Sequence, residues 1–173
     1  MTQEKTLIVF KPDAMQRGIV GEILSRFEKV GLKMIGAKML KPDYDHYYKH
    51  YEDLGKMISR RGQKAFDVTL EMMSMGPVMA IVLEGVEAAS LVRKMVGATE
   101  PKSALPGTIR GDYSHMSFGY ADNNDVGIPN LIHASGDAEE AKAEILHWFS
   151  ENELFNYEAI HEKFTQTKKS NKK

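Results

Sequence analysis

The sequence predicts an α+β fold, and three observations support this prediction. Short apolar runs bounded by charged residues, proline or glycine are typical of buried strands. They are interspersed with segments whose apolar residues recur every three or four positions, which is typical of amphipathic helices. The chain has 173 residues, with neither an internal repeat nor a Pro/Ser-rich linker, so we expect one domain with its own core.

The first half of the chain predicts two strands and three helices. The run "KTLIVF" is short, apolar and followed by Pro12, whereas "GIVGEILSRFEKVG" repeats its apolar residues at helical spacing and ends at Gly31. Asp43 is a candidate cap for a helix with tyrosines and Leu54 along one stripe. We expect strands at 5–10 and 33–40, helices at 18–31, 43–55 and 65–74, and a polar, basic loop at 55–64.

The second half predicts two more strands, each followed by a helix. Gly97 is expected to end the first of these helices, and Asp137 with Glu140 resembles a capping box that opens the second. We expect strands at 77–85 and around 131–132, helices at 86–97 and from 138, loops at 98–112 and 119–129, and a disordered basic tail at 168–173. This order suits a ferredoxin-like split βαβ sheet with helices on one face.

Composition excludes several classes of function. The sequence has no cysteine, which excludes disulfides and thiolate chemistry and favours an intracellular, cytoplasmic location. The longest apolar run, at 78–83, is too short to cross a membrane, and the first ten residues do not resemble a signal peptide. With a formal net charge of −1, the chain lacks the positive charge of a nucleic-acid coat. We therefore predict no membrane partner and no specific nucleic acid.

Phosphate binding would depend on separate side chains, because neither a Walker A motif nor a G-x-G-x-x-G loop occurs. Lys11 follows the first predicted strand and could project into a cleft, although a surface lysine is the commoner outcome. Arg93, Thr99 and Arg110 add two guanidinium groups and a hydroxyl, and guanidinium groups bind phosphate oxygens bidentately. A salt bridge between Arg110 and Asp112 is the structural alternative.

His133 is the histidine with the most informative neighbours, in the stretch "NLIHASGD". A nucleophilic imidazole needs one free nitrogen and an acceptor that holds the other. Asn130, Ser135 and Glu144 offer an amide, a hydroxyl and a carboxylate nearby in the sequence. The residues alone leave a second reading open, namely a buried histidine bonded to the backbone.

Two other histidines, His46 and His50, lie four positions apart on a predicted helix. This spacing can bind a metal ion. No third ligand is evident nearby, so we expect a solvated helix face and no metal site formed by side chains.

Five separated motifs resemble those of one family, the nucleoside diphosphate kinases. They are "KPDAMQRGIVGEIL", "HYEDL", "GPVMAIVLEG", "GATEPKSALPGTIRGDY" and "NLIHAS". The resemblance runs to about residue 155, so we expect one domain at 1–155 and a C-terminal extension at 156–173 that ends in the basic tail. It implies a βαββαβ ferredoxin-like core, a four-stranded antiparallel sheet with a long nucleotide-binding loop, and homotetramers or homohexamers.

The same resemblance implies an activity and a set of roles. A nucleoside triphosphate such as ATP would pass its terminal phosphate to a nucleoside diphosphate in a ping-pong reaction, with Mg²⁺ held mainly by the nucleotide phosphates. His133 would carry the phosphate, with Glu144, Ser135 and Tyr51 as further catalytic residues. The nucleotide-binding residues would be Lys11, Phe66, Arg93, Thr99, Arg110 and Asn130.

The chain departs from the family pattern at three places. The stretches 55–66 and 114–129 are longer than usual, and Gly136 stands where many members have Asp. Phe66 is our candidate for the ring that stacks on the base.

A ferredoxin-like binding module for nucleotides or RNA, without catalysis, is the main alternative. The stretch "SFGYA" faintly resembles an aromatic RNA-stacking motif but lacks its basic pattern. A regulatory small-molecule domain is a second alternative. An acid-labile phosphate on the protein after incubation with ATP would separate an enzyme from either binding module.

Overall fold

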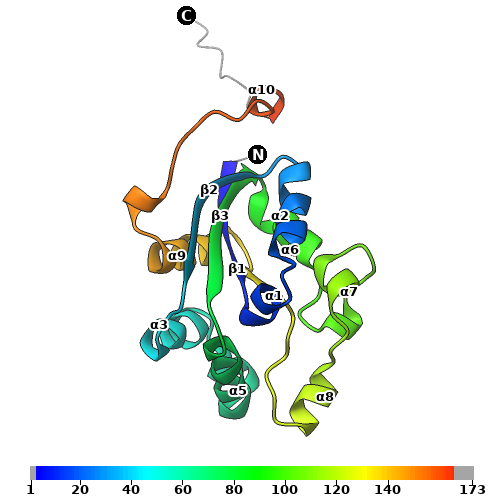
Figure 1. Cartoon of the computed structure of the whole chain (residues 1–173). Helices are drawn as coiled ribbons and strands as arrows, with labels where there is room; N and C mark the ends of the chain where they lie inside the picture. The colour runs from blue at the N-terminus through cyan, green and yellow to red at the C-terminus, as the bar shows by residue number, and fades with distance from the viewer. Residues whose placement is uncertain (1–2, 166–173) are drawn as a thin grey trace, which may run out of the picture.

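The computed structural model describes residues 3–165, which form an antiparallel sheet covered by helices (Figure 1). The strands lie in the order β2-β3-β1-β4, and every neighbouring pair is antiparallel. Their bounds are β1 Gln3–Phe10, β2 Lys33–Leu40, β3 Val78–Val86 and β4 Ile132–Ala134. Because β3 separates β1 from β2, and β1 separates β3 from β4, this is a split βαβ arrangement. The predicted ferredoxin-like α+β fold is confirmed.

The helices connect and cover these strands. Between β1 and β2 lie α1 Pro12–Gln16 and α2 Val20–Lys29. Between β2 and β3 lie α3 Tyr44–Tyr48, the π-helix η1 Lys49–Leu54, α4 Met57–Arg61 and α5 Gln63–Ser74. Between β3 and β4 lie α6 Ala88–Val96, the 3₁₀ turn η2 Pro101–Ser103, α7 Ile109–Tyr113 and α8 Phe118–Asn123. After β4 come α9 Ala138–Trp148, η3 Glu151–Glu153 and α10 Glu162–Thr165.

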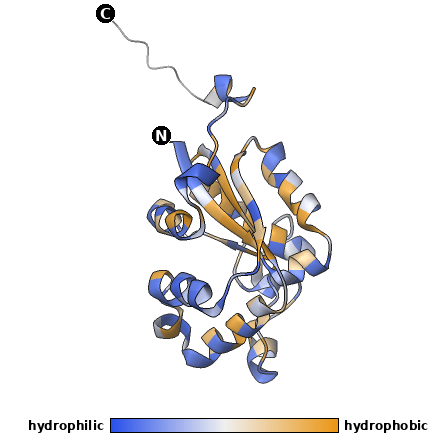
Figure 2. Ribbon diagram, turned by 60° about the vertical axis from the view of Figure 1, so that its left-hand side comes forward, coloured by the Kyte–Doolittle hydropathy of each residue, from blue (hydrophilic) through white to orange (hydrophobic). Residues whose placement is uncertain are grey.

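The sheet is buried on both faces, so the expectation of helices on one face is wrong. Ile8 and Phe10 pack with α2 and α6, whereas Leu7 and Val9 pack with α5 and α9. Successive strand side chains point to opposite faces, so each set belongs to a different core. Burial on both faces explains why the strand sequences are continuous apolar runs. In Figure 2 these strands are largely orange, the colour of hydrophobic residues.

The predicted helix at 43–55 changes its winding halfway. Asp43 is its cap, as predicted, because its carboxylate accepts a hydrogen bond of 2.9 Å from the His46 amide. The π-helix η1 follows, with an i→i+5 bond of 3.2 Å from the Gly55 amide to the His50 carbonyl. The tyrosines also do not share one buried face: within the regular helix α3, Tyr47 is buried while Tyr44 is exposed.

The stretch 55–64 is mostly helical, which contradicts the predicted loop. Its polar composition suggested a loop, but it contains the short helix α4. This helix begins after Lys56, which has a φ of 52°, and ends at Gly62, which has a φ of 87°. The Glu52 carboxylate accepts a hydrogen bond of 2.7 Å from the Ile58 amide and so anchors this turn. Similarly, α7 and α8 are short helices within the regions predicted as loops, each capped by a hydroxyl, that of Thr108 or Ser117.

Helix α9 begins at the predicted cap, but only part of the capping box forms. The Asp137 carboxylate accepts hydrogen bonds of 3.0 and 2.9 Å from the amides of Glu139 and Glu140. The Glu140 carboxylate, in turn, accepts from the Gly136 amide at 2.7 Å and does not reach back to Asp137.

The chain beyond residue 155 follows the outer strand β2 (Figure 1). The Tyr157 hydroxyl donates to the Met34 carbonyl at 2.7 Å, and the Lys33 ammonium pairs with Glu84 and Glu162 at 2.8 and 2.6 Å. The division into a domain at 1–155 and an extension stays a prediction. The predicted disordered tail at 168–173 lies outside the described residues. Within residues 3–165, no helix has the length and apolar character needed to cross a membrane.

Two glycines with nearly the same backbone conformation provide a test of packing around the helices. Gly62 and Gly97 have φ values of 87° and 86°, but a Cβ on Gly97 would lie 2.5 Å from the Thr108 hydroxyl, whereas a Cβ on Gly62 meets nothing within 4 Å. We expect Gly62→Ala to lower the free energy of unfolding by about 1–3 kcal/mol through backbone strain alone. Gly97→Ala should lower it by a further ~1–3 kcal/mol because of the clash. Urea unfolding of both variants would measure this difference, and equal losses would contradict the packing described here.

Candidate active site

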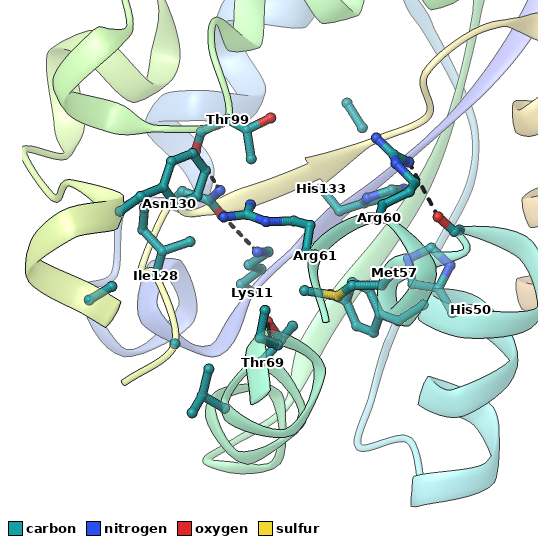
Figure 3. Close-up of a pocket in the computed structure, with 18 of the residues that line it drawn as sticks. Lys11, His50, Met57, Arg60, Arg61, Thr69, Thr99, Ile128, Asn130 and His133 are labelled. Carbon is teal, nitrogen blue, oxygen red and sulfur yellow. Dashed lines mark hydrogen bonds between the residues drawn. The ribbon is translucent and has the colours of Figure 1, made fainter. Parts of the chain in front are cut away.

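A cavity of about 420 Å³ lies where β1 ends and the antiparallel β4 begins, between η1, α4 and α5 on one side and α7 and α8 on the other (Figure 3). Its lining includes most of the residues that the sequence singled out: Lys11, Tyr51, Arg93, Thr99, Arg110, Asn130, His133 and Glu144. Two predicted site residues do not line it, namely Ser135, which is buried behind it, and Phe66.

His133 is held at the cavity by strand pairing and by a carboxylate. It lies opposite Val9 in the β1–β4 register. Its Nε2 lies 2.9 and 3.0 Å from the two carboxylate oxygens of Glu144, which is 1% exposed. A carboxylate only accepts hydrogen bonds, so the proton of the neutral imidazole resides on Nε2. The lone pair of the ring is then on Nδ1, which makes Nδ1 the nucleophilic nitrogen.

Glu144 is fixed by a second donor from the sheet side. The Ser135 hydroxyl donates to its Oε2 at 2.6 Å, and the Leu7 amide donates to that hydroxyl at 3.2 Å. A buried carboxylate is tolerated only when hydrogen bonds compensate for the lost water. The backbone of β1 thus determines, through Ser135 and Glu144, which nitrogen of His133 carries the proton.

His50 belongs to the same cluster, although the sequence predicted a solvated helix face. Its ring is buried and meets the His133 ring edge-on, with centroids 4.5 Å apart. Trp148 donates its indole N–H to His50 Nδ1 at 3.2 Å. Burial, reinforced by His133, lowers the pKa of His50 well below its ordinary value. His50 is therefore neutral, and its Nδ1, 3.7 Å from Glu144, acts as an acceptor and does not compete with His133 for the carboxylate.

The packing of α9 explains why sequence reasoning missed His50. The i, i+4 spacing keeps His46 and His50 on one face, and both rings meet the Trp148 indole of α9 edge-on, with centroid distances of 4.4 and 5.4 Å. His46 remains partly exposed at the edge of this contact, whereas His50 is buried, and the sequence spacing does not show which helix covers this face.

Lys11 is a buried cation whose amino group is held at the floor of the cavity. Its Nζ donates to the Asn130 side-chain oxygen at 2.7 Å, and the Asn130 amide donates to the Thr99 carbonyl at 2.8 Å (Figure 3). Burial, and then the charge of Arg110, lowers the pKa of Lys11 to about 8. An anion in the cavity would offset both effects.

Arg110 is buried and fixed by three main-chain carbonyls. Its Nε, Nη1 and Nη2 donate to Asn130, Gly97 and Ile132 at 3.1, 3.1 and 2.6 Å. Burial, followed by the charge of Arg93, lowers its pKa to about 10. The alternative pairing with Asp112 is wrong, because that carboxylate accepts from Arg26 at 2.8 Å. Each terminal nitrogen of Arg110 keeps one more N–H that can meet an oxyanion.

Arg93 and Tyr51 add two further donors to the cavity. Arg93, in the last turn of α6, donates to the Ala134 carbonyl at 3.3 Å. The buried Tyr51 hydroxyl has no hydrogen-bond partner among the described residues, and burial raises its pKa above the ordinary value. It remains protonated and can donate to a ligand.

Phe66 does not reach the cavity, so the prediction that it stacks on a base is wrong. Its side chain is 0% exposed and packs edge-on against Tyr48 within the core. The two longer stretches supply other lining residues that the sequence did not identify, among them Arg60, Arg61 and Phe118. Their only sequence signal was the extra length of these stretches.

Comparisons with known proteins agree with this geometry. The family model described as nucleoside diphosphate kinase matches residues 4–154. The nucleoside diphosphate kinase of Borreliella burgdorferi is 46% identical over 159 residues, covering 91% of this chain and 93% of that protein. The Pyrococcus furiosus enzyme is 43% identical over 169 residues, covering 98% and 97%.

Solved structures give the same result. A transition state mimic of the Borrelia burgdorferi nucleoside-diphosphate kinase with bound vanadate and ADP has a TM-score of 0.90 and 44% identity, covering 94% of this chain and 96% of that one. An NDP kinase from Pyrobaculum aerophilum has a TM-score of 0.80 and 37% identity, covering 90% and 100%.

The lowered pKa of Lys11 predicts a dependence of stability on pH. Between the folded value of about 8 and the ordinary value of 10.5, the unfolded chain holds more of this proton than the folded chain. The contribution of Lys11 to the free energy of unfolding should therefore rise as the pH rises through this range. In urea unfolding from pH 7 to 10.5, Lys11→Met should be stabilised relative to the unmodified protein most strongly at pH 7. The difference should shrink above pH 8, and a difference independent of pH would contradict the shift.

Proposed function

The chain belongs to the nucleoside diphosphate kinase family, and from this premise we propose that His133 carries the phosphate between its two half-reactions. The family activity is a phosphotransferase reaction, the transfer of the terminal phosphate of a nucleoside triphosphate to a nucleoside diphosphate. The observation that supports the role of His133 is the contact of 2.9 Å between its Nε2 and the buried Glu144. Nothing about a noncatalytic binding module requires this contact, so we do not propose one.

The first half-reaction forms one bond and breaks one. The lone pair of His133 Nδ1 forms a bond to the γ-phosphorus of the triphosphate, and the bond from that phosphorus to the β–γ bridging oxygen breaks. The nucleoside diphosphate leaves with the electron pair. The proton stays on Nε2, where Glu144 stabilises the positive charge that develops on the ring. A second nucleoside diphosphate then reverses these steps and takes up the phosphate.

Three cations would balance the charge of the transferring phosphate, and one hydroxyl would donate a hydrogen bond to it. Lys11, Arg93 and Arg110 line the cavity around His133, and the Tyr51 hydroxyl is an additional donor. Phosphoryl transfer requires mainly positioning and charge stabilisation from a protein. Arg110 is already immobilised by its three carbonyl contacts, so little reorganisation is needed when it binds a phosphate oxygen.

Asn130 and Thr99 lie next to Lys11 and would bind the sugar and a phosphate, respectively. The Asn130 side chain joins Lys11 to the Thr99 carbonyl. A sugar hydroxyl could therefore share the Lys11–Asn130 contact, while the Thr99 hydroxyl remains for a phosphate oxygen.

Mg²⁺ would be held by the nucleotide phosphates and not by a set of side chains. Among the described residues, one group of three potential ligands has its atoms within 4.8 Å of one another: His50, His133 and Glu144. Two of these are nitrogen donors and the carboxylate is already bonded, whereas Mg²⁺ prefers oxygen ligands and retains several waters. The cavity fits an ion carried in on the phosphates, which would neutralise charge on the departing diphosphate.

We also propose a homotetramer or homohexamer and a cytoplasmic location. Several large apolar side chains are exposed in the C-terminal part, including Phe155, Ile160 and Phe164, and exposed apolar groups favour subunit contacts when they cluster. The lack of cysteine favours a reducing compartment.

The roles of His133 and Glu144 predict different losses on substitution. His133→Ala should abolish the acid-labile phosphoenzyme, because the nucleophile is gone. Glu144→Gln should still form it, but about 10- to 1,000-fold more slowly, because an amide cannot stabilise the developing cation as a carboxylate does. Single-turnover labelling with radioactive ATP measures both rates. Glu139→Gln, on the exposed side of the same helix, is the matched control and should form phosphoenzyme at the unmodified rate. An unchanged rate of phosphoenzyme formation in Glu144→Gln would contradict the role proposed for Glu144.

A single phosphate-carrying histidine also predicts ping-pong kinetics. The first product leaves before the second substrate binds, so initial-rate plots at several fixed donor concentrations should be parallel. Intersecting lines would instead indicate direct transfer between two nucleotides bound together.

A further inference from the structure

The two longer stretches of the chain form opposite walls at one end of the cavity. Residues 55–66 contribute α4 with Arg60 and Arg61, and residues 114–129 contribute α8 with Phe118. The other lining at this end is largely apolar, with Ala65, Val68, Ala121, Val126 and Ile128, and it includes the polar Thr69 and the acidic Asp122. This composition suits a nucleobase, whereas the His133 end, with its donors and cations, suits phosphate.

A planar group already occupies the face of Phe118. The guanidinium carbon of Arg61 lies 3.9 Å from the centroid of the Phe118 ring, a stacking distance. In Figure 3 the Arg61 side chain extends from the α4 side toward the side on which Thr99, Ile128 and Asn130 lie. The guanidinium thus fills the space beside the ring that a base would need.

The two partners of this contact are anchored differently. Phe118 is fixed by its amide, which donates to the Glu100 carboxylate at 2.9 Å, and the preceding Met116 carbonyl accepts from the Lys102 amide at 2.9 Å. By contrast, α4 is one turn between left-handed residues at both ends, Lys56 and Gly62. The ring is therefore the fixed platform and the arginine is the part that can move.

Charge also favours departure of the arginine when a nucleotide binds. Arg61 shares the cavity with Lys11, Arg93 and Arg110, which repel its charge, and with the acidic Asp122 of α8, which attracts it. The phosphates of a nucleotide would attract the guanidinium while the base replaces it on the ring.

We propose that Phe118 provides the stacking face for the nucleobase and that Arg61 occupies this face until a nucleotide displaces it. The proposal rests on the proposed function, because it places the base in the same cavity as the phosphate-carrying histidine. It also assigns the base contact that Phe66, buried in the core, cannot make. Stacking accepts any base, since every base has a π face, so discrimination among bases should be slight.

The test compares ADP with inorganic diphosphate, which lacks the base and sugar, by isothermal titration calorimetry in the presence of Mg²⁺. The measured quantity is the ratio of the two dissociation constants, diphosphate over ADP, which isolates the contribution of the nucleoside from that of the phosphates. Phe118→Leu should lower this ratio about tenfold or more by weakening ADP alone, whereas Phe118→Tyr should retain it. Arg61→Ala should raise the ratio about two- to fivefold, because the base no longer competes for the ring.

Tyr120→Leu is the matched control, because Tyr120 is an exposed ring on the same helix that does not line the cavity. Its ratio should equal that of the unmodified protein. An unchanged ratio in Phe118→Leu would overturn the stacking role, and an unchanged ratio in Arg61→Ala would overturn the competition. The proposed function is tested separately by phosphoenzyme formation in the unmodified protein. If phosphoenzyme forms but the ratios of dissociation constants in the variants equal that of the unmodified protein, only this inference fails. If no phosphoenzyme forms, the proposed function is overturned.

Discussion

The contact between His133 and the buried Glu144 is the constraint on which the site depends. A carboxylate that is 1% exposed must be fully bonded, and it meets this need with one hydrogen bond from Ser135 and one from His133. Both donors lie on or just after β4, and Ser135 is tied to the backbone of β1. The packing of α9 against the sheet therefore sets the proton position on the imidazole, and Nδ1 becomes the nucleophile as a consequence of the fold.

The cations of the cavity, unlike Glu144, are not fully compensated. They are buried, and the negative charge near them is too small to offset the loss of water. Burial lowers the pKa of Lys11 to about 8 and that of Arg110 to about 10. Neutral partners, the Asn130 amide and main-chain carbonyls, hold them in place without neutralising them. Such an arrangement is destabilising in the empty protein but preorganised for an oxyanion, and a bound phosphate would relieve it.

The stretches 55–66 and 114–129 line the cavity beside the residues around His133. They contribute α4 and α8, which face each other through Arg61 and Phe118. The part of the cavity around His133 is built from strand ends and from the helix termini next to them, whose positions the sheet determines. Variation in these two stretches is therefore compatible with an unchanged sheet, because connecting segments tolerate changes in length better than the elements that they connect.

The sequence by itself determined the α+β fold, the approximate strand positions and most of the polar residues that line the cavity, because apolar periodicity and short motifs are local signals. It identified His133 and Glu144 as a pair through family resemblance, but only the tertiary structure shows which nitrogen the carboxylate holds. The structure also decided three points against the sequence reading: His50 is buried, Phe66 lies in the core, and residues 55–64 are mostly helical. Each depends on how a short, weakly patterned segment winds and packs against distant elements. Such packing is a property of the folded chain that local spacing does not encode.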